Sequence, residues 1–163
     1  MEKKTIVIID GNSLMFRAYY ATAYTGNLMQ TSNGLYTNAL YGFVNMMNKI
    51  TDSMNPTHML VAFDAGKQTF RHQQYADYKG TRKKMPEELG MQIPLIKEYL
   101  NVLGIKQLEL LDYEADDIVG SMAKLASKAG YDSQVISGDK DLLQLVDEHI
   151  TVHLTKKGIT ELD

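Results

Sequence analysis

Short runs of apolar, β-branched residues alternate along the chain with longer stretches whose apolar residues recur at helical spacing. The strand-like runs are TIVII at 5–9, HMLVAF at 58–63 and DSQVIS at 132–137, with weaker candidates near 106–110 and 149–154. Apolar runs of this kind are typical of strands that are buried on both faces of a parallel sheet. The pattern therefore predicts strands at these positions.

Three stretches between the runs have helical periodicity. In residues 37–54 the apolar positions form one stripe, made of Leu40, Phe43, Val44, Met47 and Ile50, and Asn55-Pro56 is expected to end this helix. A second helix is predicted from Pro86 to Leu103, because proline suits a first turn and Gly104 suits a C-cap. Pro94 should kink or divide it.

The third predicted helix spans residues 114–129, buries Ile118, Met122 and Leu125, and stops at Gly130. Strands that alternate with helices predict an α/β fold with a doubly wound, mainly parallel sheet. The length of 163 residues and the hydrophobic content of 44% fit a single globular domain over 1–163. We find no internal repeat, low-complexity tract or domain linker.

Composition removes several classes of function. The chain has no cysteine, which excludes disulfides, thiolate nucleophiles and cysteine-bound zinc. No apolar stretch approaches the ~20 residues of a membrane span, and the amino terminus leads directly into a strand instead of a signal-peptide pattern. We therefore expect a cytoplasmic protein without a membrane partner, and nothing in the pattern demands a partner chain, so a monomer is expected.

Seven carboxylates lie in four short blocks, IVIIDGNS, LVAFDAG, YEADDIVG and ISGDKDL, and three of these blocks place the acid just after an apolar run. The seven are Asp10, Asp64, Glu114, Asp116, Asp117, Asp139 and Asp141. Ligands of α/β proteins bind beyond the carboxyl ends of the strands, so these acids should converge there. Crowded carboxylates repel one another unless protons or cations lie among them, and hard divalent cations suit oxygen ligands best.

Each block by itself has a structural alternative. Acids in the first turn of a helix offset the helix dipole, which could explain Glu114, Asp116 and Asp117. Asp10 before Gly11-Asn12-Ser13 could be a turn or N-cap residue. Four such placements at one sheet edge would have to be independent accidents, which favours a shared function.

Spacing within the third block also suits two ions. Glu114 and Asp117 share a helix face, while Asp116 points elsewhere and can reach a second metal position. Two cations about 3.5–4 Å apart can activate a water and stabilise the departing oxygen of a phosphodiester.

A basic segment complements the acids. Residues 67–84 contain Lys67, Arg71, Lys79, Arg82, Lys83 and Lys84 against the single Asp77, so the segment carries +5 within a chain of net charge -3. Such a stripe favours a polyanion, and Phe70, Tyr75 and Tyr78 could stack on unpaired bases. A solvated lysine-rich loop is the alternative.

Other α/β chemistries lack their motifs. An aspartyl-phosphate phosphatase needs a second acid two residues after its nucleophile, but Asp10 is followed by Gly11 and Asn12. There is no G-x-x-x-x-G-K-[ST] and no G-x-G-x-x-G, so the phosphate cradles of nucleotide-binding folds are missing. The four histidines show no zinc-like grouping with acids, and His149 and His153 are interpreted as strand-surface residues.

Four strings, IIDGNSLMFRAYYA, VAFDAGKQTFRHQQYADYKGTRKKMPEEL, YEADDIVGSMAKLA and VISGDKDLLQLV, closely resemble the 5′-3′ exonuclease domain of bacterial DNA polymerase I, of the flap endonuclease family. The resemblance covers essentially the whole chain. It implies a PIN-like fold and hydrolysis of DNA or RNA-primer phosphodiesters at a 5′ flap or 5′ end, with two ions of Mg²⁺ or Mn²⁺, in replication and repair.

The resemblance also assigns roles to residues. The seven carboxylates named above correspond to the metal ligands of the family. Its basic arch matches residues 65–85, with Arg71, Tyr78, Lys79 and Arg82 as DNA contacts, and with Lys79 and Arg82 acting in catalysis. Arg17, on the helix after the first strand, corresponds to a further phosphate contact.

At the carboxyl end the chain departs from the family pattern. Members continue into two further metal-binding aspartates and a helical hairpin that grips duplex DNA, so we expect an amino-terminal fragment with an incomplete second metal site and weak or no activity. A covalently linked polymerase domain is expected in the natural protein. Two alternatives are a PIN-type ribonuclease, disfavoured by the long basic segment, and a catalytically silent DNA-binding module, disfavoured by the retained acids.

Overall fold

The computed structural model of the chain describes residues 4–23, 31–32, 34–64, 86–110 and 113–155. The elements follow in the order β1 (Thr5–Asp10), α1 (Gly11–Ala23), α2 (Asn38–Met54), β2 (His58–Ala62), α4 (Glu87–Gly90), α5 (Ile93–Val102), β3 (Lys106–Leu108), α6 (Ala115–Lys128), β4 (Asp132–Ser137), the 3-10 helix η2 (Lys140–Leu145) and β5 (Ile150–Leu154).

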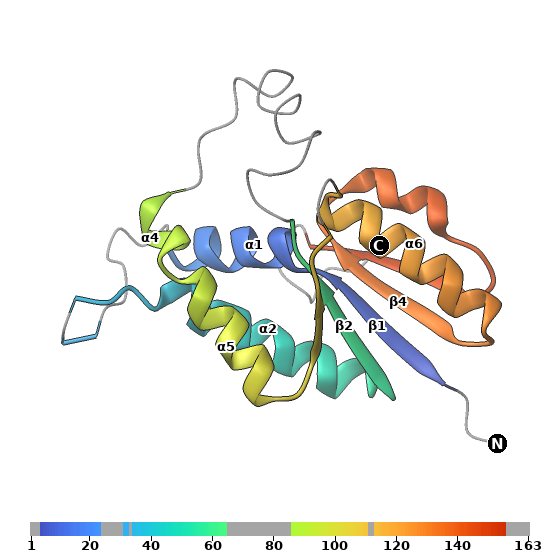
Figure 1. Ribbon diagram of the computed structural model, residues 1–163, viewed down its shortest axis with the longest axis horizontal. Coiled ribbons are helices and arrows are strands. Elements are labelled where there is room, and N and C mark those ends of the chain that lie inside the picture. Colours follow the sequence, from blue (N-terminus) through green and yellow to red (C-terminus); the bar gives the residue numbers. More distant parts are fainter. Residues whose placement is uncertain (1–3, 24–30, 33, 65–85, 111–112, 156–163) are drawn as a thin grey trace.

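The described strands form one parallel sheet in the order β3-β2-β1-β4-β5 (Figure 1). Ile8 in the central strand lies opposite Leu60 on one side and Val135 on the other. The predicted doubly wound, parallel α/β sheet is therefore confirmed, and all predicted strands are present.

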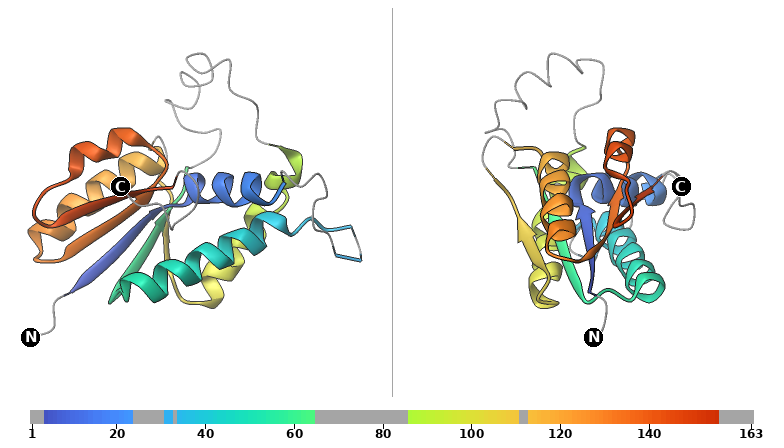
Figure 2. Two further views of the ribbon diagram at one scale, coloured as in Figure 1. Left: turned by 180° about the vertical axis from the view of Figure 1, so that it is seen from behind. Right: turned by 90° about the vertical axis from the view of Figure 1, so that its right-hand side faces the viewer.

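Helices cover both faces of the sheet, as the two views of Figure 2 show. On one face, Val7, Ile9 and Val61 pack with the apolar sides of α1, α2 and α5. On the other face, Ile8 and Val135 pack with α6. Because successive strand residues point to opposite faces, β1 contributes to both cores, and its residues 6–9 are all apolar.

The predicted helix over 86–103 is divided, as Pro94 indicated. Helix α4 ends at Gly90, α5 begins at Ile93, and Pro94 lies in the first turn of α5, where its missing N–H leaves no bond unmade. Gly104 and Gly130 have φ values of +73° and +89°, the left-handed conformation expected for residues that end helices.

Two features differ from the expectations drawn from periodicity. Leu125 was expected to be buried, but it is 59% exposed, because α6 faces the sheet through smaller residues such as Ala115, Val119 and Ala123. Periodicity also gave no helix over 11–23, where α1 begins directly after the last residue of β1 with no connecting turn.

Gly11 permits this abrupt start. A Cβ at this position would lie 2.6 Å from the Phe63 ring and 2.8 Å from the carbonyl oxygen of Ala62. Any side chain here would therefore push α1 away from the end of β2. In the part of the chain that the structure describes, no helix is both long enough and apolar enough to span a membrane.

Candidate active site at the carboxyl edge of the sheet

Asp10 ends the central strand and is only 5% exposed. Its carboxylate accepts hydrogen bonds from the Ser13 backbone N–H (3.2 Å), the Ser13 hydroxyl (2.9 Å) and the Ser137 hydroxyl (3.0 Å). Burial raises the pKa of Asp10, the charge of Asp64 adds to this rise, and the three donors oppose it. The fold thus holds a carboxyl group in a place that disfavours its charge.

Ser137 joins the Asp10 block to the Asp139 block. It is the last residue of β4, is fully buried, donates to Asp10 and accepts a hydrogen bond from the Asp139 N–H (3.1 Å). Asp139 in turn caps η2, since its side chain accepts from the Asp141 N–H at 2.9 Å. Asp141 itself is exposed, in the first turn of η2.

Asp116 lies on α6 and faces the same edge. Its pKa is raised to about 7, first by burial, then by the charges of Asp117, Glu114 and Asp10, and by a hydrogen bond with Asp139. Two carboxyl groups can share a hydrogen bond only if one of them holds a proton. Asp10, Asp116 and Asp139, which we call the crowded group, therefore interact although they come from three separate blocks of sequence.

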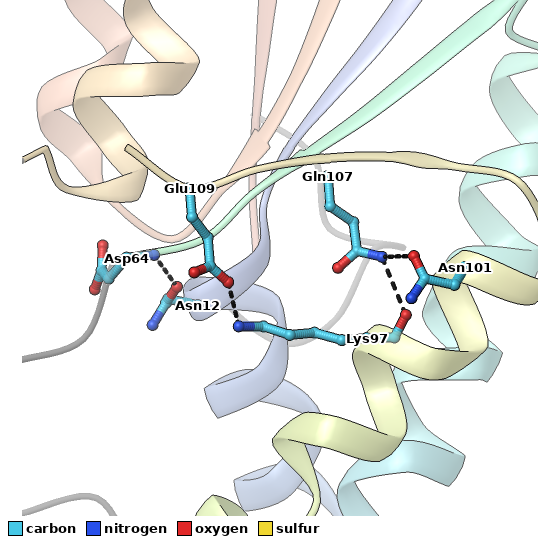
Figure 3. A network of polar contacts seen from close by, with 6 residues as sticks. All are labelled: Asn12, Asp64, Lys97, Asn101, Gln107 and Glu109. Atoms are coloured by element: carbon cyan, nitrogen blue, oxygen red, sulfur yellow. Dashed lines mark hydrogen bonds and ion pairs between the residues drawn. The ribbon is translucent and has the colours of Figure 1, made fainter. Parts of the chain in front are cut away.

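The remaining acids are held by backbone donors around the start of α6. Asp64 follows β2; its N–H donates to the Asn12 side chain at 2.8 Å (Figure 3), and its carboxylate accepts from the Ala115 N–H at 2.6 Å. Glu114 and Asp117 form a capping box, in which each side chain accepts from the other residue's backbone N–H. We call Asp64, Glu114 and Asp117 the capped group.

The capping box shows that the structural alternative for Glu114 and Asp117 is real, because both residues satisfy the exposed N–H groups of a helix start. It does not exclude a second role, since a carboxylate has more lone pairs than one cap uses. The sequence pattern identified both residues, and the structure shows that they cap helix α6 in the absence of a ligand.

The acids can be compared with the needs of a divalent cation. Among the described residues, no group of three or more His, Asp or Glu side chains stands close enough together to hold a metal ion. The donor set nevertheless suits a hard cation, because carboxylate oxygens alone are offered and the raised pKa of Asp116 shows that negative charge is crowded there, which a cation would neutralise. The ligand types of the crowded group therefore suit a divalent ion, but the side chains would have to move closer together to bind it.

Other site residues predicted from the sequence fall in two classes. Arg71, Tyr78, Lys79 and Arg82 lie outside the described residues. Arg17 lies on α1 and is half-buried, and within the described part of the chain its Nε atom is buried without a hydrogen-bond partner.

Sequence reasoning missed Asn12, Ser13 and Ser137 as residues that hold the acids. Asn12 and Ser13 were noted only as a possible turn after Asp10, and Ser137 only as the end of a strand. Their common signal is a small polar residue at the carboxyl end of an apolar strand, the position that faces the ligand crevice of α/β folds.

The histidines take no part in this edge among the described residues. His149 is exposed, with its Nδ1 atom 3.4 Å from Asp132, and agrees with a surface position. His153 is half-buried and bonds to Gln134, so its interpretation as a strand-surface residue needs correction, and burial lowers its pKa. Its contact with Gln134 of the neighbouring strand β4 leaves it less exposed than the strand pattern suggested.

The chain is similar in sequence to known proteins. The chain is 49% identical over 163 residues to DNA polymerase I of Streptococcus pneumoniae (strain ATCC BAA-255 / R6), covering all of this chain and 19% of that protein. It is 50% identical over 161 residues to DNA polymerase I of Bacillus caldotenax, covering 99% of this chain and 18% of that protein. The chain thus spans about a fifth of the length of these relatives.

Solved structures share the fold at lower identity. The T5 5′-exonuclease with bound divalent metal ions (zinc) matches with a TM-score of 0.64 and 20% identity, over 93% of this chain and 55% of that chain. Flap endonuclease-1 from Methanococcus jannaschii matches with a TM-score of 0.59 and 16% identity, over 98% and 58%. These likenesses support the PIN-like fold expected from the sequence.

Residues 5–163 match the family model described as the 5′-3′ exonuclease, N-terminal resolvase-like domain. The match covers nearly the whole chain, including both the crowded and the capped group of acids. The chain belongs to this family of 5′-3′ exonuclease amino-terminal domains.

Proposed function

We propose that this chain forms the acid-lined part of a metal-dependent nuclease that hydrolyses phosphodiesters at the 5′ end or 5′ flap of DNA, including RNA primers. One observation carries the proposal. Asp10, Asp116 and Asp139 interact at the carboxyl edge of a parallel sheet, and the pKa of Asp116 is raised to about 7. A fold that stabilised only itself would gain by separating these charges.

The carboxylates of Asp10, Asp116 and Asp139 would hold one divalent cation, Mg²⁺ or Mn²⁺, and the capped group and Asp141 would contribute to a second position. When bound, such ions lower the pKa of a water molecule and neutralise charge on the phosphodiester. The match to a 5′-3′ exonuclease family and the divalent metal ions bound to the T5 5′-exonuclease support the use of divalent metals in general.

The protein's own residues would orient the reactants. Ser13 and Ser137 fix both oxygen atoms of Asp10, and Asn12 fixes the backbone at Asp64. The guanidinium of Arg17 on α1 would bind a phosphate oxygen, because arginine binds phosphate in a fixed, charge-assisted geometry. These contacts would position the scissile phosphate without reading base sequence.

The basic segment would supply the remaining contacts. Arg71 and Tyr78 would bind the single-stranded 5′ end, and Lys79 and Arg82 would bind the scissile phosphate and assist its hydrolysis. Lysine and arginine give sequence-independent affinity, so this binding should weaken strongly with added salt. By analogy with its relatives, the domain would act within a cytoplasmic DNA polymerase I, in replication and repair.

The proposal is tested by cleavage of a 5′-labelled flap duplex with Mn²⁺ or with chelator, using this chain and a version continued with the sequence that follows it in its relatives. We expect metal-dependent release of the flap by the longer protein, and slow or absent release by the 163-residue chain. Binding of the flap without cleavage by either folded protein would contradict the nuclease proposal and favour a DNA-binding module. Cleavage of an RNA strand but not of DNA would favour a ribonuclease.

A further inference from the structure

Gln92 lies in the break between α4 and α5, and its side chain is fully buried. Its Oε1 atom accepts hydrogen bonds from the N–H groups of Ala39 (2.7 Å) and Leu40 (3.1 Å). Its Nε2 atom donates to the side-chain oxygen of Asn38 and to the carbonyl oxygen of Glu88, both at 2.9 Å. One amide group thus makes four hydrogen bonds, three of them to backbone or side-chain atoms more than 50 positions away.

Two of these bonds cap another helix. The first N–H groups of an α-helix have no partner within the helix, and the residue before α2, Thr37, makes no side-chain cap. Gln92 supplies the missing acceptor from outside, while it makes no cap for α5, the helix that it precedes. The position of Gln92 is therefore tied to the start of α2 instead of to its own helix.

Asn38 extends the network to α1. Its Nδ2 atom donates to the Thr22 hydroxyl (3.0 Å) and lies 3.4 Å from the Tyr19 carbonyl oxygen, and it is 1% exposed. The same two helices touch closely at Gly42, where a Cβ would lie 3.0 Å from the Ala18 carbonyl oxygen. Helices α1, α2 and α4 are thus joined by buried hydrogen bonds and close backbone packing.

The two ends of this joined unit lie at functionally important places. At its start, α1 carries Asn12 and Ser13, which hold the Asp64 backbone and Asp10, and Arg17 follows on the same helix. Helix α4 begins one residue after Pro86, so it directly follows the basic residues 67–84 in the sequence. A shift of α4 relative to α1 would move the attachment point of the basic segment relative to the acids.

We infer that Gln92 is a positioning residue for the proposed reaction, which fixes the base of the basic segment relative to α1 and its acid-holding residues. This inference rests on the proposed function, since it assigns the basic segment to the DNA. Substitution of Gln92 should therefore slow the cleavage only of substrates that bind this segment. Hydrolysis of a small phosphodiester that reaches the acids alone should not depend on it.

The test compares two substrates in a polypeptide that contains this chain and cleaves flap DNA. For Gln92→Ala, we expect kcat/KM on a 5′-flap duplex to fall, by up to about 10²-fold, because small misplacements far from the chemistry have effects of this size. Hydrolysis of bis(p-nitrophenyl) phosphate with Mn²⁺ should stay unchanged at a temperature where the variant is fully folded. An equal loss on both substrates, or no loss on either, would overturn the inference.

A second variant covers the case in which Gln92→Ala fails to fold. In Gln92→Glu the carboxylate can still accept from the N–H groups at the start of α2, where the helix dipole favours a negative charge. It can no longer donate to Asn38 or Glu88, so the cap on α2 is kept while the bond to α4 and the bond to Asn38, the residue that contacts α1, are lost. We expect the same selective loss on flap DNA, and wild-type flap kinetics for this variant would contradict the inference.

Gln107→Ala is the matched control. Gln107 also donates two hydrogen bonds, to the Lys97 carbonyl oxygen (3.0 Å) and to Asn101 (2.8 Å), but it ties β3 to α5 away from α1 and α4 (Figure 3). Its loss should lower stability without a selective effect on flap DNA. If the wild-type polypeptide cleaves neither substrate, the proposed function fails. If the wild type cleaves both substrates and the Gln92 variants cleave flap DNA as fast as the wild type does, this inference alone fails.

Discussion

Asp116 and Asp117 are adjacent in the sequence, yet their carboxylates belong to two differently built regions. Asp117, in the capped group, accepts the Glu114 N–H within a capping box at the start of α6. Asp116, in the crowded group, accepts one backbone N–H at 3.0 Å, but its pKa is raised first by burial, then by the charges of Asp117, Glu114 and Asp10, and last by a hydrogen bond with Asp139. One acid stabilises the helix, whereas its neighbour is held among like charges.

The difference separates two reasons for placing an acid at a helix start. Helix-dipole and capping interactions favour ionised carboxylates and stabilise the fold without a ligand. Like charges gathered from three blocks destabilise it unless a proton or a cation lies between them. Substitution in the two regions should therefore change metal-free stability in opposite directions.

The largest effect is expected for Asp116→Asn. Loss of its charge should lower flap cleavage by at least about 10²–10³-fold in a cleavage-competent polypeptide, as loss of one preorganised electrostatic contact does in other enzymes. The same change should raise the melting temperature in chelator above pH 7, because it removes a partly buried charge and its repulsion with Asp117, Glu114 and Asp10. Calorimetry and a flap assay measure the two effects, and a lower melting temperature would favour a purely structural role.

Ser137→Ala should come next. The variant removes the donor to Asp10 and leaves the Asp139 N–H without its acceptor. Loss of a residue that orients metal ligands typically weakens metal affinity by about 10–100-fold, which titration calorimetry with Mn²⁺ can measure. Ser127→Ala is the control, since the buried Ser127 hydroxyl has no partner within the described residues. Equal affinities for the two variants would remove Ser137 from the site.

Asp117→Ala should destabilise the metal-free chain by about 1 kcal/mol, the usual effect of losing a helix cap. The sign is opposite to that for Asp116→Asn, so the pair tests the comparison directly. Chemical denaturation in chelator gives both free energies of unfolding. If both variants gain stability, the capping box contributes less than the repulsion around it, and the division into two groups is wrong.

The smallest expected effect is a pH dependence of metal-free stability. Asp116 has a pKa near 3.8 when unperturbed and about 7 in the fold, so the folded chain holds a proton between these values that the unfolded chain has lost. Its contribution to stability should therefore fall as pH rises from about 4 to 7. Because Asp116 is only partly buried, water screens the effect. Asp116→Asn should remove this component of the pH profile.

Much of the fold could be predicted because its signals are local. The strands were predicted from uninterrupted apolar runs, which are needed where alternate residues pack into two different cores. Gly104 and Gly130 follow helices at positions that require a left-handed backbone conformation. Periodicity did not predict helix α1, which only the family resemblance implied, because this helix follows β1 without a turn, at a junction that needs Gly11 against Phe63. The prediction that Leu125 is buried was wrong, because helical spacing does not show how much of the helix surface the sheet covers.

The sequence by itself determined which acids gather at one edge, since each is close to the end of a strand or the start of a helix, and parallel strands end on the same side. Only the tertiary structure decided how they divide. Whether a carboxylate meets a hydrogen-bond donor or another carboxylate depends on groups from distant blocks, such as the Ser137 hydroxyl beside Asp10 and the Ala115 backbone N–H beside Asp64. Local sequence fixes the positions of charges along the chain, but their energies depend on contacts made across the fold.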